Sequence, residues 1–367
     1  MISEAVLLRS LGHEVFVSAP DFPGFDLWSS QMRAIGARVI SFNPPNFVEV
    51  WRWRHLRQFL SFGNSIYLRR LRIDLATVFS CDMTFCGSKA YVLHDSGIPW
   101  VISIHVPCWQ YFYNSWAERQ LRNAFSSMLG GYTVSNTVRE SFLRYAGHLI
   151  HDAENIEVIK NGVDVSHFFP DPANRVAVRQ SLGIGPENFC VVFFGRLDSN
   201  KDPLLALKIF RHLTRLCPRG RLIVLGDGVL RADVLNAVQE NGLEGKVTLA
   251  GHVNDVRTYL LSADAYIACS TKEGYSLSTA EALASGLPSV LPDHGAYNEC
   301  FSGSGAFFYS LDDPEGAALS LARIADSSSE VRANLQNAAR VFAERELSLD
   351  TMNSRLHSFY EKCFRMI

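Results

Sequence analysis

Apolar runs of strand length alternate with segments of helical length along this 367-residue chain. The clearest strand candidates are 99–104, 190–194 and 263–269, because each is a short, largely apolar run. Helical segments occur between such runs, among them 203–214 and 277–285. Strands that alternate with helices build parallel sheets covered by helices, so the sequence predicts an α/β fold.

The chain is long enough to bury two hydrophobic cores, with 47% hydrophobic and 20% charged residues. At 165–173 (VSHFFPDPA), two prolines and two phenylalanines interrupt helical periodicity, which is typical of a linker. We therefore expect an N-terminal domain at 1–165 and a C-terminal domain at 166–347. A last helix is expected within 348–367, because apolar residues recur there at helical spacing.

Two glutamates flank a strand-to-helix turn in the stretch 270–288, STKEGYSLSTAEALASGLP. Glu273 lies in the loop, and Glu281 lies eight positions later, about one turn into the helix. The amide groups at 276–278 have no helical partner at such a helix start, which favours the binding of a phosphate. Glu273 is placed to reach sugar hydroxyls and Glu281 to accept hydrogen bonds from a ribose. The stretch therefore suits a nucleotide sugar.

Two cations follow the strand at 190–194, in the segment FFGRLDSNKDP. Arg196 and Lys201 come after Gly195, before the next helix begins. Open α/β sheets bind ligands outside the carboxyl ends of their strands, so both charges are expected beside an anionic ligand.

These residues resemble a motif of the retaining GT-B glycosyltransferases, in particular glycosyltransferase family 4, in which two glutamates are separated by seven residues. Weaker matches follow in the order of the family at 12–15, 104–105, 134–135, 158–164, 226–228 and 251–253. The resemblance implies the GT-B fold, in which two Rossmann-like domains face a cleft. It also implies that the C-terminal domain binds the nucleotide-sugar donor and that the last helix packs back on the acceptor-side N-terminal domain.

The resemblance assigns roles to individual residues. Arg196 and Lys201 match the cations that hold the donor diphosphate, and Glu273 matches the residue that orients the donor sugar. The nucleotide base is expected near Val253. The expected catalytic residues are His105 and Glu273, and the expected donor-binding residues are Gly195, Arg196, Lys201, Val253, Gly274, Tyr275, Ser276, Leu277, Ser278 and Glu281.

The implied activity is transfer of a hexose, with retention of configuration, from a UDP- or GDP-sugar to a hydroxyl of a glycan, a lipid-linked saccharide or a small molecule. Cations and helix amides would stabilise the charge that grows on the leaving diphosphate. The sequence has no Asp-x-Asp segment, so neither a metal nor another cofactor is expected. Two alternatives stay open: a nucleotide-sugar epimerase of the same architecture, and a catalytically inactive relative that binds a sugar or a partner.

The start of the sequence departs from the family pattern. A helical segment at 3–11 opens it, and a strand is expected at 12–17. The first strand and the glycine-rich loop of the N-terminal domain, which the family has upstream of these elements, are therefore missing. A piece missing upstream explains this better than the loss of part of the cleft.

Composition excludes several other classes of protein. A formal net charge of -2 gives no general attraction to nucleic acid. The eight cysteines form no C-x-x-C pair, which indicates reduced thiols in a cytoplasmic protein. No apolar run is long enough to span a membrane, and no signal peptide opens the sequence.

The segment 51–72 (WRWRHLRQFLSFGNSIYLRRLR) holds six arginines, several aromatic residues and no acidic residue. One interpretation is a surface helix whose aromatic residues are core and whose arginines are solvated. The other is a peripheral contact with the inner face of a membrane, which would favour a lipid-linked acceptor in glycolipid or polysaccharide biosynthesis.

Overall fold

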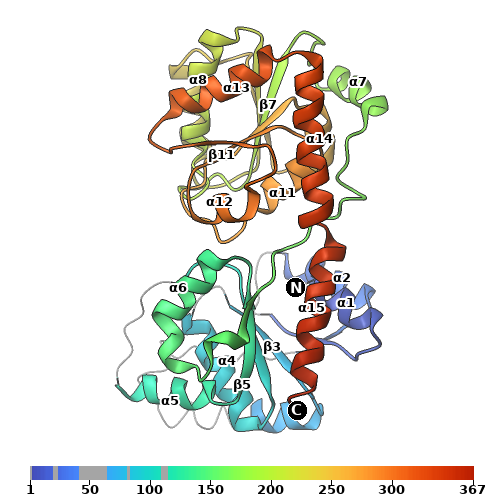
Figure 1. Cartoon of the computed structure of the whole chain (residues 1–367), viewed down its shortest axis with the longest axis vertical. Helices are drawn as coiled ribbons and strands as arrows, with labels where there is room; N and C mark the ends of the chain where they lie inside the picture. Colours follow the sequence, from blue (N-terminus) through green and yellow to red (C-terminus); the bar gives the residue numbers. More distant parts are fainter. Residues whose placement is uncertain (1, 20–23, 41–63, 81–82, 109–114) are drawn as a thin grey trace. The chain divides into compact units, whose positions relative to one another are not determined.

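The computed structural model describes residues 2–19, 24–40, 64–80, 83–108 and 115–367 (Figure 1). The chain divides into two compact units, of which the N-terminal unit comprises Met1–Lys160 and Met352–Ile367 and the C-terminal unit comprises Asn161–Thr351. Both units combine helices with parallel sheets, so the predicted α/β class is confirmed.

The N-terminal unit contains a four-stranded parallel sheet and a separate parallel pair of strands. The order in the larger sheet is β3-β4-β5-β6, and β1 pairs with β2. The strands are β1 (Phe16–Val17), β2 (Arg38–Val39), β3 (Ala76–Ser80), β4 (Trp100–Ile104), β5 (Met128–Thr133) and β6 (Ile156–Val158). The helices are α1 (Ile2–Ser10), α2 (Phe25–Ala34), α4 (Met83–Ser96), α5 (Ser115–Phe125) and α6 (Asn136–Ala146), with single 3-10 turns at Gly147–Leu149 and Ala153–Asn155.

The first strand is shorter than the sequence predicted. Only Phe16–Val17 pairs with another strand, whereas 12–17 was expected to be extended. The reason lies at Gly12, whose φ of 89° ends α1 in a left-handed turn and whose amide group donates to the carbonyl of Arg9. The chain therefore turns at Gly12 before it becomes extended, so the strand begins later than expected.

The last helix, α15 (Leu349–Phe364), packs within the N-terminal unit. The hydroxyl of Tyr360 donates to the carboxylate of Glu4 in α1 and lies 2.7 Å from the hydroxyl of Thr77 in β3. Tyr132 in β5 also donates to Glu4, at 2.7 Å. Burial raises the pKa of Glu4 above its usual value. One buried carboxyl group therefore joins α1, β5 and α15 near the two ends of the chain.

The C-terminal unit is built on a six-stranded parallel sheet of order β12-β11-β10-β7-β8-β9. Its strands are β7 (Phe189–Phe194), β8 (Gly220–Leu225), β9 (Val247–Gly251), β10 (Ala265–Ile267), β11 (Ser289–Pro292) and β12 (Phe307–Tyr309). Its helices are α7 (Pro172–Ser181), α8 (Pro203–Leu216), α9 (Arg231–Glu240), α10 (Val256–Ser262), α11 (Leu277–Ala284), α12 (Gly295–Phe301), α13 (Pro314–Asp326) and α14 (Ser329–Glu346).

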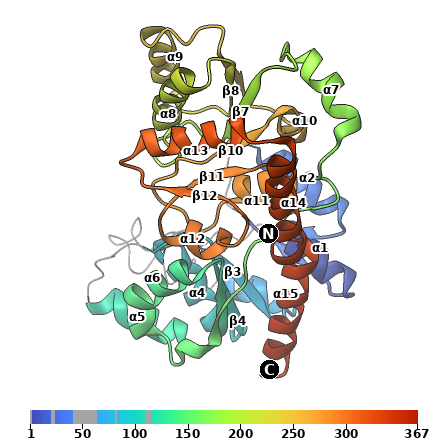
Figure 2. The same cartoon turned by 45° about the horizontal axis from the view of Figure 1, so that its top comes forward.

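Alternation along β7 explains how this sheet is covered. Phe189, Val191 and Phe193 join a core with α8, α9 and α13 on one face of the sheet (Figure 1, Figure 2). The residues between them are also buried, and by the period of two they point to the opposite face. A strand that is buried on both faces is continuously apolar, which is why this segment was recognisable as a strand from the sequence.

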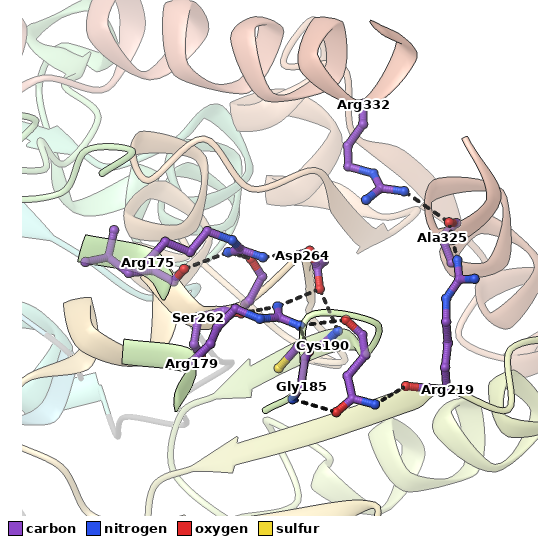
Figure 3. Close-up of polar contacts among 12 residues, drawn as sticks. Arg175, Arg179, Gly185, Cys190, Arg219, Ser262, Asp264, Ala325 and Arg332 are labelled. Carbon is purple, nitrogen blue, oxygen red and sulfur yellow. Dashed lines mark hydrogen bonds and ion pairs between the residues drawn. The ribbon is translucent and has the colours of Figure 1, made fainter. Parts of the chain in front are cut away.

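A buried cluster of charged residues fastens α7 to the amino ends of β7 and β10 (Figure 3). Asp264, just before β10, accepts hydrogen bonds from Arg175 at 2.7 Å and Arg179 at 3.1 Å, both in α7. The same carboxylate accepts from the backbone amide of Cys190 in β7 at 2.8 Å. Arg179 also donates to the carbonyls of Ser262, Gly185 and Asn188. The cluster is hydrogen-bonded within the fold and lies at the end of the sheet opposite the candidate site.

Candidate functional site

The expected donor-binding residues lie in the C-terminal unit, in loops that leave the carboxyl ends of its strands. The loops after β7 and β8 begin with a glycine, and β9 ends with one. The amide group of Gly195 donates to Leu225 at 3.1 Å, and that of Gly226 donates to Gly251 at 2.7 Å. A Cβ atom on Gly226, whose φ is 125°, would lie 1.9 Å from the carbonyl oxygen of Gly195. The loops therefore meet backbone to backbone, which only glycine permits here.

The loop between β7 and α8 is held by its own carboxylates. The side chain of Asp198 accepts from the amides of Asn200 at 3.1 Å and Lys201 at 3.0 Å. Asp202 caps α8 by accepting from the amide of Leu205 at 3.0 Å. Arg196 extends from this loop with 77% of its side chain exposed and contacts Asp198 at 3.3 Å. Its guanidinium group is therefore accessible to an anion.

Lys201 and Glu273 form an ion pair between the β7–α8 loop and the β10–α11 loop. The amide of Thr271 donates to the carbonyl of Asn200 at 2.8 Å, which adds a backbone link between the same loops. From the sequence we expected both charged residues at the donor site, with Lys201 beside the diphosphate. In the structure, the partner of Lys201 is the carboxylate that was expected to orient a sugar.

Helix α11 begins at Leu277 with a network of hydroxyl groups beneath its first turn. Ser276 caps the helix and accepts from the amide of Thr279 at 3.4 Å. Ser278 accepts from the hydroxyl of buried Tyr266 at 3.1 Å and lies 3.1 Å from the hydroxyl of Ser276. The amide of Thr279 is thus occupied, whereas the amides of the first helical residues have no carbonyl partner within the helix. These free amides make the turn suitable for an anion.

The aromatic residue of the same loop behaves differently from the expectation. The side chain of Tyr275 is buried, and its ring centroid lies 5.5 Å from that of Phe301 in α12. The side chain therefore belongs to the core of the C-terminal unit, and only its backbone and that of Gly274 belong to the loop surface. The donor-binding role expected of Tyr275 stays a prediction, and with its side chain buried that role falls to its backbone.

Glu281 lies within α11, and its carboxylate is half-buried. Burial raises the pKa of Glu281 to about 7. Within the described part of the chain, the carboxylate has no hydrogen-bond or ion-pair partner. A desolvated carboxylate without donors of its own is suited to accept hydrogen bonds from hydroxyl groups of a ligand.

The region expected to hold the nucleotide base is built largely from backbone. Leu197 donates its amide to the carbonyl of Asp227 at 2.9 Å and accepts from the amide of Leu230 at 2.9 Å. Val253 follows β9 and is half-buried. The β7, β8 and β9 loops thus lie together at this edge, with Val253 among them.

His105 lies in the N-terminal unit, at the carboxyl end of β4. Its Nε2 atom is 2.8 Å from the hydroxyl oxygen of Ser103, and its ring is stacked on Phe79 at a centroid distance of 6.0 Å. Burial lowers the pKa of His105 to about 4. The imidazole is therefore neutral at pH 7 and acts as a polar group without charge.

One residue at the carboxyl edge of the C-terminal sheet, His294, was not selected from the sequence. His294 follows β11, and its Nε2 atom lies 2.8 Å from the carbonyl oxygen of Ser270. Its signal in the sequence was its place two residues after an apolar strand, the same place that Arg196 has after β7.

Metal binding, membrane insertion and the arginine-rich segment concern other parts of the chain. Among the described residues, no group of three or more His, Cys, Asp or Glu is arranged to hold a metal ion. Within the same ranges, no helix combines the length and apolarity needed to cross a bilayer. Most of the segment 51–72 lies outside the described residues; of its end, 64–70 is helical, with Leu68 buried and Tyr67 exposed.

Comparison with known proteins agrees with this architecture. The family model for Glycosyltransferase Family 4 matches residues 4–167, and that for Glycosyl transferases group 1 matches residues 174–342. The crystal structure of HepE from Anabaena in complex with UDP superimposes with a TM-score of 0.79 at 18% identity, over 98% of this chain and 95% of that one.

Two curated relatives match part of the chain. The UDP-Gal:alpha-D-GlcNAc-diphosphoundecaprenol alpha-1,3-galactosyltransferase of Escherichia coli is 29% identical over 48% of this chain and 46% of its own length. The mannosylfructose-phosphate synthase of Agrobacterium fabrum is 32% identical over 46% of this chain and 39% of its own length. The chain thus spans about half the length of the curated relatives it matches, or less.

The two family models divide the chain between them, and its α/β units have the GT-B fold of the solved neighbours. The resemblance found in the glutamate motif is thereby confirmed. The chain belongs to the group 1 glycosyltransferases.

Proposed function

We propose that the protein transfers a hexose from a UDP-sugar to a hydroxyl acceptor. The observation that carries this proposal is the convergence, at one edge of the C-terminal sheet, of exposed Arg196, the first-turn amides of α11 and the half-buried carboxylate of Glu281. This set matches an anionic diphosphate flanked by hydroxyl groups. Uridine is favoured over guanosine because HepE was solved with UDP and with UDP-glucose, and the name of the E. coli relative specifies UDP-Gal.

Each part of the donor has a group of matching chemistry. Arg196 and the first-turn amides of α11 take the diphosphate, and Lys201 lies in the same loop as Arg196. Glu281 accepts from the ribose hydroxyls, and backbone groups near Val253 take the base. Glu273 orients the hexose, with its carboxylate held by Lys201.

The chemistry requires stabilisation of charge rather than a strong base. The bond between the anomeric carbon and the diphosphate oxygen breaks, and a bond from the acceptor oxygen forms on the same face, which retains configuration. The proton of the acceptor hydroxyl passes to the departing phosphate. Arg196, Lys201 and the helix amides stabilise the negative charge that develops on that phosphate, so the proposed reaction runs without a metal ion. His105 is proposed to contact the sugar or the phosphate as a neutral hydrogen-bonding group.

The acceptor is proposed to be a hydroxyl of a glycan. The name of the E. coli relative specifies a saccharide linked to diphosphoundecaprenol. A lipid-linked saccharide is therefore the first acceptor to test, ahead of small molecules.

Thermal unfolding with nucleotides tests the donor site. The melting temperature is measured with UDP, GDP, ADP and CMP in the presence of EDTA, because a ligand that binds only the folded state raises it. We expect a rise with UDP that is lost in Arg196→Ala. The matched control is Arg345→Ala, since Arg345 in α14 is also exposed and pairs with a neighbouring acidic residue, Glu346, at 2.9 Å. An unchanged response in Arg196→Ala, or no response to any nucleotide, contradicts the proposal.

Product analysis separates the proposed transferase from the two alternatives. A transferase releases UDP in step with a glycosylated acceptor. An epimerase converts the UDP-sugar into its epimer without an acceptor, and a binding relative leaves the UDP-sugar unchanged under both conditions.

A further inference from the structure

His294 links the end of β11 to the loop that carries Glu273. The Nε2 atom of His294 lies 2.8 Å from the carbonyl oxygen of Ser270. A carbonyl oxygen only accepts hydrogen bonds, so Nε2 carries a proton and donates it. The contact thereby defines which ring nitrogen is protonated in the neutral form of His294.

The loop from Ser270 to Glu273 is held from both sides. On the β7 side, the carbonyl of Asn200 accepts from the amide of Thr271 at 2.8 Å, and Lys201 pairs with Glu273. On the β11 side, the side chain of His294 donates to the carbonyl of Ser270. The strand order β11-β10-β7 places the loop after β10 between these two supports.

The imidazole ring of His294 is itself held in place. It packs edge-on against the buried ring of Tyr297 in α12, with centroids 5.4 Å apart. The neighbouring carboxylate of Asp293 accepts from the side-chain amide of Asn298 at 2.6 Å, so this acid is engaged elsewhere. The ring is therefore oriented by packing on one side and by the Ser270 carbonyl on the other.

We propose that His294 is a positioning residue that sets the selectivity of the site among hexoses. It holds the Glu273 loop on the side that Lys201 and Asn200 do not reach. Removing this tie changes the placement of the carboxylate that meets the sugar, while Arg196 and the start of α11, which take the diphosphate, keep their own supports. The proposal rests on the proposed function, since it concerns the sugar end of the same donor site.

Two substitutions separate the effect of the hydrogen bond to Ser270 from the effect of the imidazole ring itself. In His294→Gln, the side-chain amide nitrogen takes the place of Nε2 and keeps the donor. In His294→Asn, the side chain is one bond shorter and does not reach Ser270. A matched structural control is Ser289→Ala, which removes a 2.9 Å hydrogen bond from Ser289 to Leu287 at the opposite end of β11.

The measurement is the dissociation constant for UDP, UDP-glucose, UDP-galactose and UDP-N-acetylglucosamine by titration calorimetry. Selectivity is the ratio between the weakest and the tightest of the three UDP-sugars. We expect His294→Asn to reduce this ratio by up to about tenfold, the effect of one net hydrogen bond. His294→Gln and Ser289→Ala keep the ratio, and the affinity for UDP stays within about twofold throughout.

The selectivity ratio is the readout that a purely structural role does not move. A general loss of stability weakens the binding of UDP and of all three UDP-sugars alike, and so leaves their ratio unchanged.

Three results overturn the proposal: a wild type that binds the three UDP-sugars equally, an unchanged ratio in His294→Asn, and a lost ratio in His294→Gln. A wild type that binds no nucleotide at all contradicts the proposed function instead. The two failures are thus distinguishable.

Discussion

Lys201 and Glu273, 72 residues apart in the sequence, form an ion pair in which only 18% and 11% of their side chains are exposed. The pair joins the loop after β7 to the loop after β10, and it places an expected donor-binding residue, Lys201, in contact with an expected catalytic residue, Glu273. Because water is largely excluded, each charge depends on the other for compensation.

Breaking this pair from one side is expected to destabilise the fold. Lys201→Met or Glu273→Gln alone should lower the free energy of unfolding by about 2–3 kcal/mol, because one charge stays largely buried without its partner. The double variant should recover most of this loss. Chemical denaturation measures it, with Lys362→Met as control, since Lys362 pairs with Glu157 at 3.2 Å in a more exposed setting. Equal losses in the control and in the single variants would refute the prediction.

Donor affinity is expected to depend on pH through Glu281. Burial raises the pKa of Glu281 to about 7, and only the ionised carboxylate accepts two hydrogen bonds from a ribose. The affinity for UDP-glucose should therefore fall as the pH drops below 7, approaching about tenfold per pH unit. UDP-glucose is the ligand of choice because the terminal phosphate of UDP itself titrates near pH 6. Calorimetry at pH 6 and pH 8 checks this, and Glu281→Gln should remove the dependence.

The stability of the chain is expected to fall with rising pH through Glu4. Burial raises the pKa of Glu4 above its usual 4.5, so the folded state keeps a proton that the unfolded state has lost. The contribution to stability is complete below pH 4.5 and declines as the pH rises through the folded pKa. Urea denaturation from pH 4.5 to pH 8, in a Glu281→Gln background, should show this slope. Glu4→Gln flattens it, whereas Glu140→Gln, an exposed residue of α6, leaves it intact.

His105 is expected to remain neutral through the physiological range. Burial lowers the pKa of His105 to about 4, below its usual 6.5. The unfolded state therefore binds a proton at a higher pH than the folded state does. The free energy of unfolding should decline as the pH falls from 6.5 to 4. The imidazole resonance in an NMR titration reports this directly, with exposed His151 as the internal comparison. A transition of the His105 resonance near pH 6.5 would contradict the assignment of a neutral contact.

The cluster of charged residues around Asp264, at the amino ends of β7 and β10, is expected to affect stability and to leave nucleotide binding unchanged. Arg179 donates to Asp264 and to three backbone carbonyls in a buried setting. Arg179→Met should lower the free energy of unfolding by about 3 kcal/mol, because it leaves Asp264 with one cation and several carbonyls unpaired. Since the cluster lies at the amino ends of the strands, the affinity for UDP, measured well below the melting temperature, should not change. Arg231→Met, which loosens an exposed 3.8 Å pair with Asp227, is the control for stability.

Local pattern accounts for much of what was predicted correctly. The helix predicted at 277–285 is α11 (Leu277–Ala284), and its end is set by Gly286, whose φ is 73°. The strand predicted at 190–194 is β7, which is apolar because both of its faces are buried. These signals lie in neighbouring residues, so both elements can be predicted without knowledge of the rest of the chain.

The sequence by itself determined the α/β class, the position of the two glutamates around the start of α11 and the cations that follow β7. The tertiary structure alone decided what these groups contact. Strands β8 and β9 separate β7 from β10 along the chain, yet β10 lies between β7 and β11 in the sheet. That order brings Lys201 to Glu273 and His294 to Ser270, and it buries Tyr275. Such contacts depend on long-range pairing and on burial, which local periodicity does not encode.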